Sequence, residues 1–126
     1  MAPDTEPAPM RLQPTPAAAA LARRHVAAAC HGRLTPEAEE AARLLVSELV
    51  TNCVRHAHTA ITLVIDCDDA RVAVAVGDDA DGVPVVREPD EHALGGRGLQ
   101  LVDAMAGEWG VQRRPDGGKV VWFRLP

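Results

Sequence analysis

The most informative segment of this chain is SELVTNCVRH, residues Ser47–His56. It lies inside a pattern typical of a helix with one apolar face. Glu48, Asn52 and His56 are spaced four residues apart, so on a helix they lie along one stripe. A carboxylate can take a proton from water or a hydroxyl, and an amide oxygen can bind a hard cation. The stripe therefore indicates a functional site inside a helix that otherwise builds the core.

A surface ion pair is the alternative role for Glu48, with Arg43 or Arg55 as its partner. Exposed pairs of this kind are common and contribute little to stability. Asn52 favours the site, because asparagine is a poor helix former and is seldom chosen for a helix interior. This segment alone leaves both interpretations open.

Length, charge and cysteine content limit the class of protein. The 126 residues suit one domain, and the net charge of −5 comes without a basic stripe or tail, so nucleic acid is not an expected partner. No apolar run is long enough to span a bilayer and no secretion signal is visible, so we expect a cytoplasmic protein. The three cysteines form no closely spaced pair and are expected to be buried, reduced thiols; they are Cys30, Cys53 and Cys67.

The N-terminal part is expected to hold a leader and one helix. Residues 1–16 are rich in Pro and Ala and predict a disordered leader, so the ordered domain would span 17–126. A first helix is predicted over 17–31, with Gly32 ending it. Its inward-facing residues would be Leu21, Val26 and Cys30.

A second helix has a strong start signal. Thr35 can cap the free N–H groups and Pro36 suits the first helical position, so the helix is predicted to begin there and to reach about Ala57. Glu48, Asn52 and Arg55 would lie at the edge of its apolar face, with His56 just inside it. That face would consist of Ala42, Leu45, Val46, Leu49, Cys53 and Ala57.

The remaining elements predict an α+β fold. Alternating apolar residues predict two hairpins, and a third helix is expected over 98–106. The four strand patterns cover 61–65, 72–76, 109–113 and 119–125. Hairpins separated by helices favour a two-layer α/β sandwich, in which a mainly antiparallel sheet carries the helices on one face.

Two further segments could bind a ligand. Asp78 follows a strand directly, and a carboxylate fixed there can accept a hydrogen bond from an exocyclic amine; a plain acidic turn is the alternative. A Walker A loop is excluded, because Val83 and Pro84 stand where Lys and Ser or Thr are required. The glycines of 95–98 precede a helix and could hold phosphates, or could simply form a turn. Leu101 stands where a dinucleotide fingerprint needs its third glycine.

Two other patterns are weaker. Gly117-Gly118-Lys119 favours a hairpin turn over a ligand site. Cys53, His56 and His58 lie close in sequence, but structural zinc usually needs a second pair of ligands, so zinc is not expected. No nucleophile motif is present.

Taken together, these motifs resemble one family. SELVTNCVRH (47–56), Asp78, GGRGL (95–99) and GGKVVWF (117–123) follow one another in this order. The combination resembles the Bergerat-fold ATPases, the GHKL superfamily of gyrase, histidine kinases and MutL, over about residues 17–125. Within it, the chain is similar to small stand-alone ATP-binding proteins of actinobacteria, and those are similar to anti-sigma-factor serine/threonine kinases.

The resemblance implies ATP and Mg²⁺ as ligands and assigns roles to residues. Glu48 would orient or deprotonate the attacking hydroxyl or water, Asn52 would hold Mg²⁺, and Asp78 would read adenine. A short ATP lid would cover 85–95. The other implied nucleotide-binding residues are Arg55, His56, Gly82, Gly96, Arg97, Gly98 and Leu99.

The chain departs from the family pattern at two places. Ala80 stands where the first glycine box usually has glycine, which would tighten the adenine pocket. Val120 stands where many relatives place a threonine that helps to bind adenine. Neither departure removes Glu48 or Asn52.

Two functions follow from the resemblance. The first is a kinase that transfers the γ-phosphate of ATP to a partner protein, an anti-anti-sigma antagonist, with Glu48 as the base. The second is a module that sequesters a sigma factor or a sensor protein and is only tuned by nucleotide; its candidate surface is the first helix with Arg23 and Arg24. A self-contained ATPase is less expected, because the lid is short. The sequence leaves the question of a homodimer undecided.

Overall fold

A computed structural model describes residues 8–79, 94–115 and 117–125. Within them the sheet has the order β1-β2-β3-β5-β4, and all neighbouring strands are antiparallel. The strands are β1 (Met10–Leu12), β2 (Ile61–Cys67), β3 (Val72–Asp78), β4 (Glu108–Arg113) and β5 (Lys119–Leu125). The helices are α1 (Ala18–Cys30), α2 (Pro36–Asn52) and α3 (Leu94–Met105).

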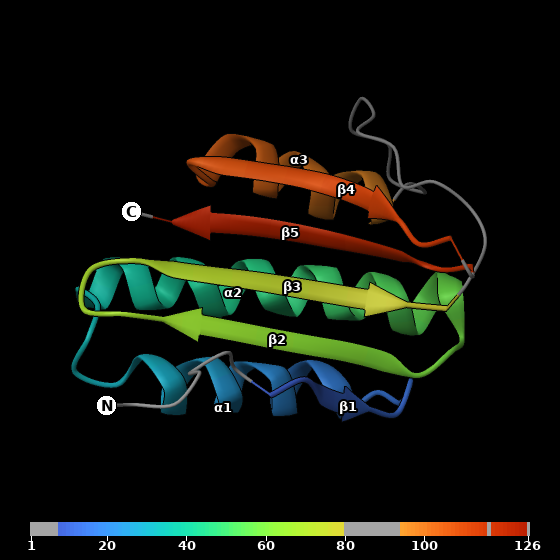
Figure 1. The fold of residues 1–126 in the computed structure, drawn as a ribbon, viewed down its shortest axis with the longest axis horizontal. Helices are drawn as coiled ribbons and strands as arrows, with labels where there is room; N and C mark the ends of the chain where they lie inside the picture. The colour runs from blue at the N-terminus through green and yellow to red at the C-terminus, as the bar shows by residue number, and fades with distance from the viewer. Residues whose placement is uncertain (1–7, 80–93, 116, 126) are drawn as a thin grey trace.

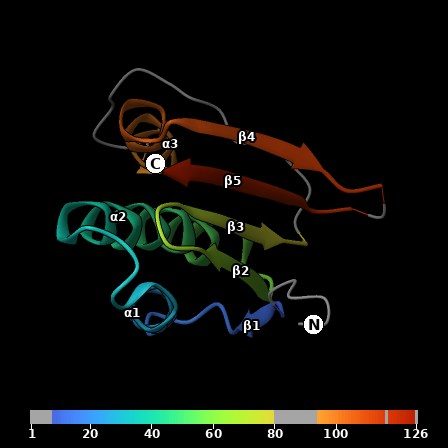
Figure 2. The ribbon, with the colours of Figure 1, turned by 60° about the vertical axis from the view of Figure 1, so that its left-hand side comes forward.

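The helices form one layer on one face of the sheet (Figure 1), and Figure 2 shows the two layers from the side. Helix α2 lies centrally, between α1 and α3, behind β3. This arrangement confirms the predicted two-layer α+β fold. None of the helices in the described ranges is long and apolar enough to cross a membrane.

The alternation of side chains explains which face of the sheet is buried. In β3 and β5 every second residue points toward the helices. The buried residues of this set are Val72, Val74, Val76, Val121, Phe123 and Leu125. Phe123 is the one aromatic side chain among the buried residues of the described ranges, so the core is otherwise aliphatic.

Helix α1 buries a stripe of small side chains. The buried residues are Ala18, Ala22, Val26 and Cys30. Leu21 was expected to face inward, but 38% of it is exposed. That prediction is wrong because Leu21 lies about 100° around the helix from Ala22, away from the stripe spaced by four. Gly32, with φ of 73°, ends the helical region as predicted.

Helix α2 begins as its start signal predicts. The Thr35 Oγ1 accepts a hydrogen bond from the Ala38 N–H at 3.1 Å, and Pro36 is the first helical residue. The helical region also reaches Ala57, but its last part is one wide π-helical turn, η1 (Cys53–Ala57). The His58 N–H donates to the Cys53 carbonyl at 3.2 Å, five residues back.

Two boundaries differ from the prediction. Met10–Leu12 pairs with β2, and Leu12 is only 5% exposed, so the expectation of a disordered leader is wrong for this part. Met10 and Leu12 point to the same face of β1, and this strand forms one edge of the sheet beside β2. Residues 1–7 lie outside the described ranges. Helix α3 starts at Leu94, before the expected start near Gly98.

Candidate functional site

The glycine segment meets the polar stripe of α2. A Cβ atom placed on Gly98 would lie 2.6 Å from the Asn52 Nδ2 and 3.6 Å from the Glu48 Cβ. The first distance is too short for any real contact, so residue 98 can carry no side chain unless Asn52 moves. The backbone of α3 therefore lies directly against the two polar residues predicted to form the site.

Helix α3 brings the glycines to this place in its first turns. The first four N–H groups of an α-helix have no partner within the helix, and here they include those of Gly95 and Gly96. Such a helix start favours anions. Leu99 was also predicted to bind nucleotide, but its side chain is 2% exposed and packs in the core.

Asp78 is the one charged residue that is buried among the described residues, with 3% of it exposed. It ends β3 and lies directly opposite Lys119, the first residue of β5. The Lys119 Nζ lies 3.2 Å from Oδ1 and 3.1 Å from Oδ2 of Asp78. The Cys53 thiol donates to Oδ2 at 3.6 Å. The buried carboxylate therefore contacts the helical residue that directly follows Asn52 in the chain.

Close approach of the strand ends holds this pair together. Gly118 has φ of 86°, and a Cβ there would overlap the Asp78 carbonyl oxygen. Asp79 continues the strand end, where its N–H donates to the Thr59 Oγ1 at 3.0 Å and its carboxylate lies 3.5 Å from Arg114. These contacts fix the strand end that carries Asp78.

Strand parity corrects the assignment of Val120. Val121 and Phe123 face the helices, so Lys119 faces them as well and Val120 points to the other side of the sheet. Lys119, rather than Val120, is therefore the β5 residue beside Asp78. Sequence reasoning missed Lys119, although one signal was present: it is the only lysine of the chain.

The π-helical turn η1 changes the direction in which the last residue of the stripe, His56, points. Glu48 and Asn52 are half-buried on α2, but Arg55 and His56 are exposed. The prediction that His56 lies just inside the apolar face is wrong, because a π-helical turn takes more residues per turn than an α-helix and rotates His56 outward. π-Helical turns are frequent at functional sites.

Several predicted positions fall outside the described ranges. They are Gly82, Ala80 and most of the lid segment 85–95, of which Leu94 and Gly95 belong to α3. Arg97 is in α3 as well.

The described residues do not support a zinc site. They contain no group of three His, Cys, Asp or Glu side chains that could hold a metal ion. Cys53 contacts Asp78, and His56 and His58 are exposed. Asn52 could still supply one oxygen to Mg²⁺, since this ion usually takes few protein ligands and completes its shell with phosphates and water.

The buried thiols are kept protonated. Burial, followed by the neighbouring Asp78 carboxylate, raises the pKa of Cys53 from 9.0 to about 12. Burial, followed by a hydrogen bond with Cys67, raises the pKa of Cys30 to about 12. All three cysteines are free thiols, but Cys67 is only half-buried, so the expectation of burial is wrong for Cys67.

These shifts predict a loss of stability in alkali. Above pH 9 the unfolded chain releases thiol protons that the folded chain keeps up to about pH 12, so the free energy of unfolding falls as pH rises between these values. The slope is about 1.4 kcal/mol per pH unit for each thiol. Urea unfolding from pH 8 to about 10.5 measures it. Cys53→Ala is expected to make the slope shallower, and an unchanged slope would contradict the assigned cause.

Comparison with known proteins identifies the family to which the chain belongs. The described part of the chain combines a buried strand-end carboxylate, two polar residues on α2 and a helix that starts with glycines. The family model of the histidine kinase-like ATPase domain matches residues 12–125. The chain therefore belongs to the histidine kinase-like ATPase family, as the resemblance to the GHKL superfamily predicted.

One solved structure resembles the chain. The chain is similar to the histidine kinase domain of the E. coli osmosensor EnvZ, determined by NMR, with 19% identity and a TM-score of 0.49. The match covers 100% of this chain and 92% of that domain. No curated protein matches the chain.

Proposed function

We propose that this chain is a cytoplasmic ATP-binding regulatory protein that phosphorylates a serine or threonine of a partner protein. The observation that carries the proposal is the contact of Gly98 with Asn52 and Glu48, since a Cβ on Gly98 would reach the Asn52 amide at 2.6 Å. A helix start with anion-binding N–H groups is thereby held against a carboxamide and a carboxylate. Phosphoryl transfer needs mainly such positioning and neutralisation of charge.

Each residue has a distinct task in this proposal. Asp78 accepts a hydrogen bond from the adenine amine, and the N-terminal backbone of α3 binds the phosphates. Glu48 accepts the proton of the attacking hydroxyl. Asn52 would hold Mg²⁺, which supplies neutralisation of phosphate charge when bound. The hydroxyl comes from another protein, an antagonist of anti-anti-sigma type.

Acid stability of the product tests the reaction type. The full chain would be incubated with Mg²⁺, γ-³²P-ATP and an extract of its source cells, and proteins separated before and after acid treatment. Transfer to serine or threonine gives a labelled band that survives acid, whereas phosphohistidine is lost. A label that disappears in acid, or the absence of any label that depends on added protein, would contradict the proposal.

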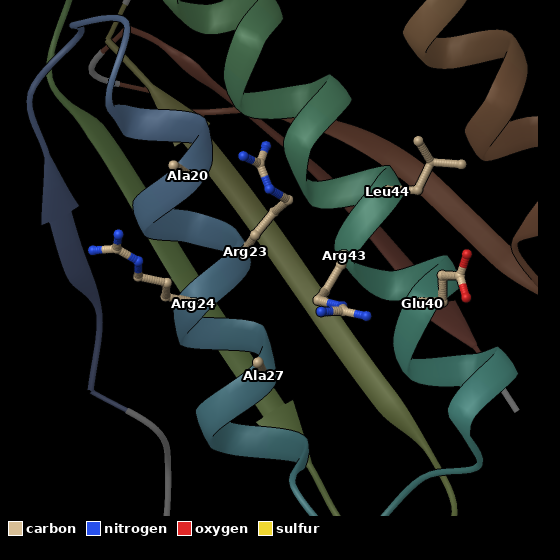
Figure 3. Close-up of a pocket in the computed structure, with 7 residues that line it drawn as sticks. All are labelled: Ala20, Arg23, Arg24, Ala27, Glu40, Arg43 and Leu44. Atoms are coloured by element: carbon tan, nitrogen blue, oxygen red, sulfur yellow. The ribbon is translucent and has the colours of Figure 1, made fainter.

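A second candidate function is binding of a partner protein without catalysis, and a groove between α1 and α2 favours it. The groove has a volume of about 680 Å³, and its lining contains three arginines and one acidic residue, beside Ala20, Ala27 and Leu44; the charged residues are Arg23, Arg24, Arg43 and Glu40. Figure 3 shows that Arg23 and Arg43 project between the helices, while Arg24 points away from α2. The Arg23 Nη1 donates to the Ser47 Oγ at 2.8 Å, and the buried Arg43 Nε has no hydrogen-bond partner in the described part of the chain.

Charge reversal distinguishes this binding function from the kinase. On a protein of net charge −5, a groove rich in arginine fits an acidic segment of a sigma factor or sensor. Arg23→Glu and Arg43→Glu are expected to weaken capture of the partner about tenfold or more, whereas Glu48→Gln acts like wild type. Arg113→Glu, an exposed position on β4, is the matched control. Equal loss in Arg113→Glu would show non-specific attraction.

A further inference from the structure

We propose that Lys119 reads the nucleobase together with Asp78, by donating a hydrogen bond to ring N1 of adenine while Asp78 accepts from the exocyclic amine. The inference rests on the proposed ATP site. It adds a direct protein contact to the second atom of the adenine edge.

The Asp78 carboxylate and the Lys119 ammonium are in direct contact. Asp78 and Lys119 are cross-strand partners on the helix-facing side of the sheet. The Nζ lies 3.1 Å and 3.2 Å from the two carboxylate oxygens, and the side chains are only 4% and 16% exposed. Lys119 is thus held beside the carboxylate and is the more exposed of the two, so a base that reaches Asp78 would meet the Lys119 ammonium next to it.

The chemistry of the pair matches the adenine edge. Adenine presents a donor, the amine on C6, next to an acceptor, ring N1. A carboxylate only accepts and an ammonium only donates, so Asp78 beside Lys119 presents the complementary pattern. A carboxylate has about four acceptor sites, so Asp78 can accept from the ammonium and from the Cys53 thiol and still accept from an amine. An ammonium also has three donors, enough for Asp78 and for N1.

A purely structural role for Lys119 is the competing explanation. Removing the cation from a buried pair leaves an uncompensated carboxylate, so Lys119 stabilises Asp78 in any case. The two explanations differ in one respect: only base reading makes the effect of Lys119 depend on atom N1 of the ligand.

A double-mutant cycle between protein and ligand separates them. Calorimetry would measure the affinity of the full chain and of Lys119→Met for AMP-PNP, its 1-deaza analogue and, as a ligand control, its 7-deaza analogue. Wild type is expected to bind the 1-deaza analogue about 10- to 100-fold more weakly than AMP-PNP. Lys119→Met is expected to bind these two ligands equally, and the 7-deaza analogue is expected to follow AMP-PNP.

Each outcome decides a different claim. If Lys119→Met weakens AMP-PNP and the 1-deaza analogue by the same factor, Lys119 has only a structural role and the inference is overturned, while the ATP site stands. If wild type binds none of the ligands, the proposed function fails and the inference fails with it. Should Lys119→Met not fold, the lysine Nζ resonance of the wild-type chain tests the same contact without any substitution.

The single lysine offers an independent signal. Selective ¹⁵N-lysine labelling gives one side-chain Nζ resonance, because Lys119 is the only lysine of the chain. AMP-PNP is expected to shift this resonance strongly and the 1-deaza analogue to leave it near its free position. Identical shifts with both ligands would overturn the proposed contact.

Discussion

Glu48→Gln is expected to slow phosphoryl transfer to a partner protein about 10²- to 10⁴-fold, while ATP still binds. Glutamine has the size of glutamate, but its amide cannot take the proton of an attacking hydroxyl at neutral pH. The neighbouring Asn52 and the backbone at Gly98 are unchanged in this variant, so the contacts proposed for Mg²⁺ and the phosphates remain. Initial rates with γ-³²P-ATP and calorimetry with AMP-PNP measure the two effects separately.

A glutamate elsewhere on α2 provides the control. Glu37 is exposed in the first turn of the helix, so Glu37→Gln makes the same chemical change far from the stripe and should leave transfer unaltered. Persistent transfer in Glu48→Gln would show that Glu48 is not the base. It would leave the nucleotide site intact but reassign the proton acceptor.

Gly98→Ala is expected to lower the affinity for ATP about tenfold or more, equal to about 1.4 kcal/mol of binding free energy. The new Cβ would meet the Asn52 Nδ2 at 2.6 Å, so the carboxamide has to leave its position. The free energy of unfolding should not fall, because alanine favours a helix by about 1 kcal/mol over glycine and the group displaced is the end of a side chain. Stability and affinity thus change independently, which calorimetry and urea unfolding detect.

The double variant Gly98→Ala/Asn52→Ala tests the cause. Both substitutions remove the same contribution of Asn52, so the double variant should lose no more affinity than Asn52→Ala alone. Additive losses would mean that Gly98 acts independently of Asn52, through the backbone alone. Wild-type affinity in Gly98→Ala would contradict the assignment of this contact to the nucleotide site.

Local patterns predicted most of the fold. The Thr35-Pro36 start, the alternating strands and the turn residues each act within a few residues, so they can be read directly. Strand β1 escaped prediction because Met10–Leu12 is too short to show a period and is stabilised by its pairing with β2. Leu21 was misplaced because a large apolar side chain outweighed the regular spacing of the small ones.

The residues of the candidate site were likewise read from local patterns. Spacing on one helix gave Glu48 and Asn52, and the strand end gave Asp78. The meeting of Glu48 and Asn52 with Gly98 is a tertiary contact that no local pattern contains. Lys119 was missed because the preceding glycines already explain a turn. The position of His56 was predicted wrongly because no feature of the local sequence predicts the π-helical turn.

Titration of ATP by calorimetry, with and without Mg²⁺, on wild type and Asn52→Ala tests the central claim most directly. A working nucleotide site predicts saturable binding that Mg²⁺ strengthens and that Asn52→Ala weakens. Absence of binding by wild type up to millimolar ATP would contradict the account, and the chain would then be a member of its family that acts through protein contacts alone.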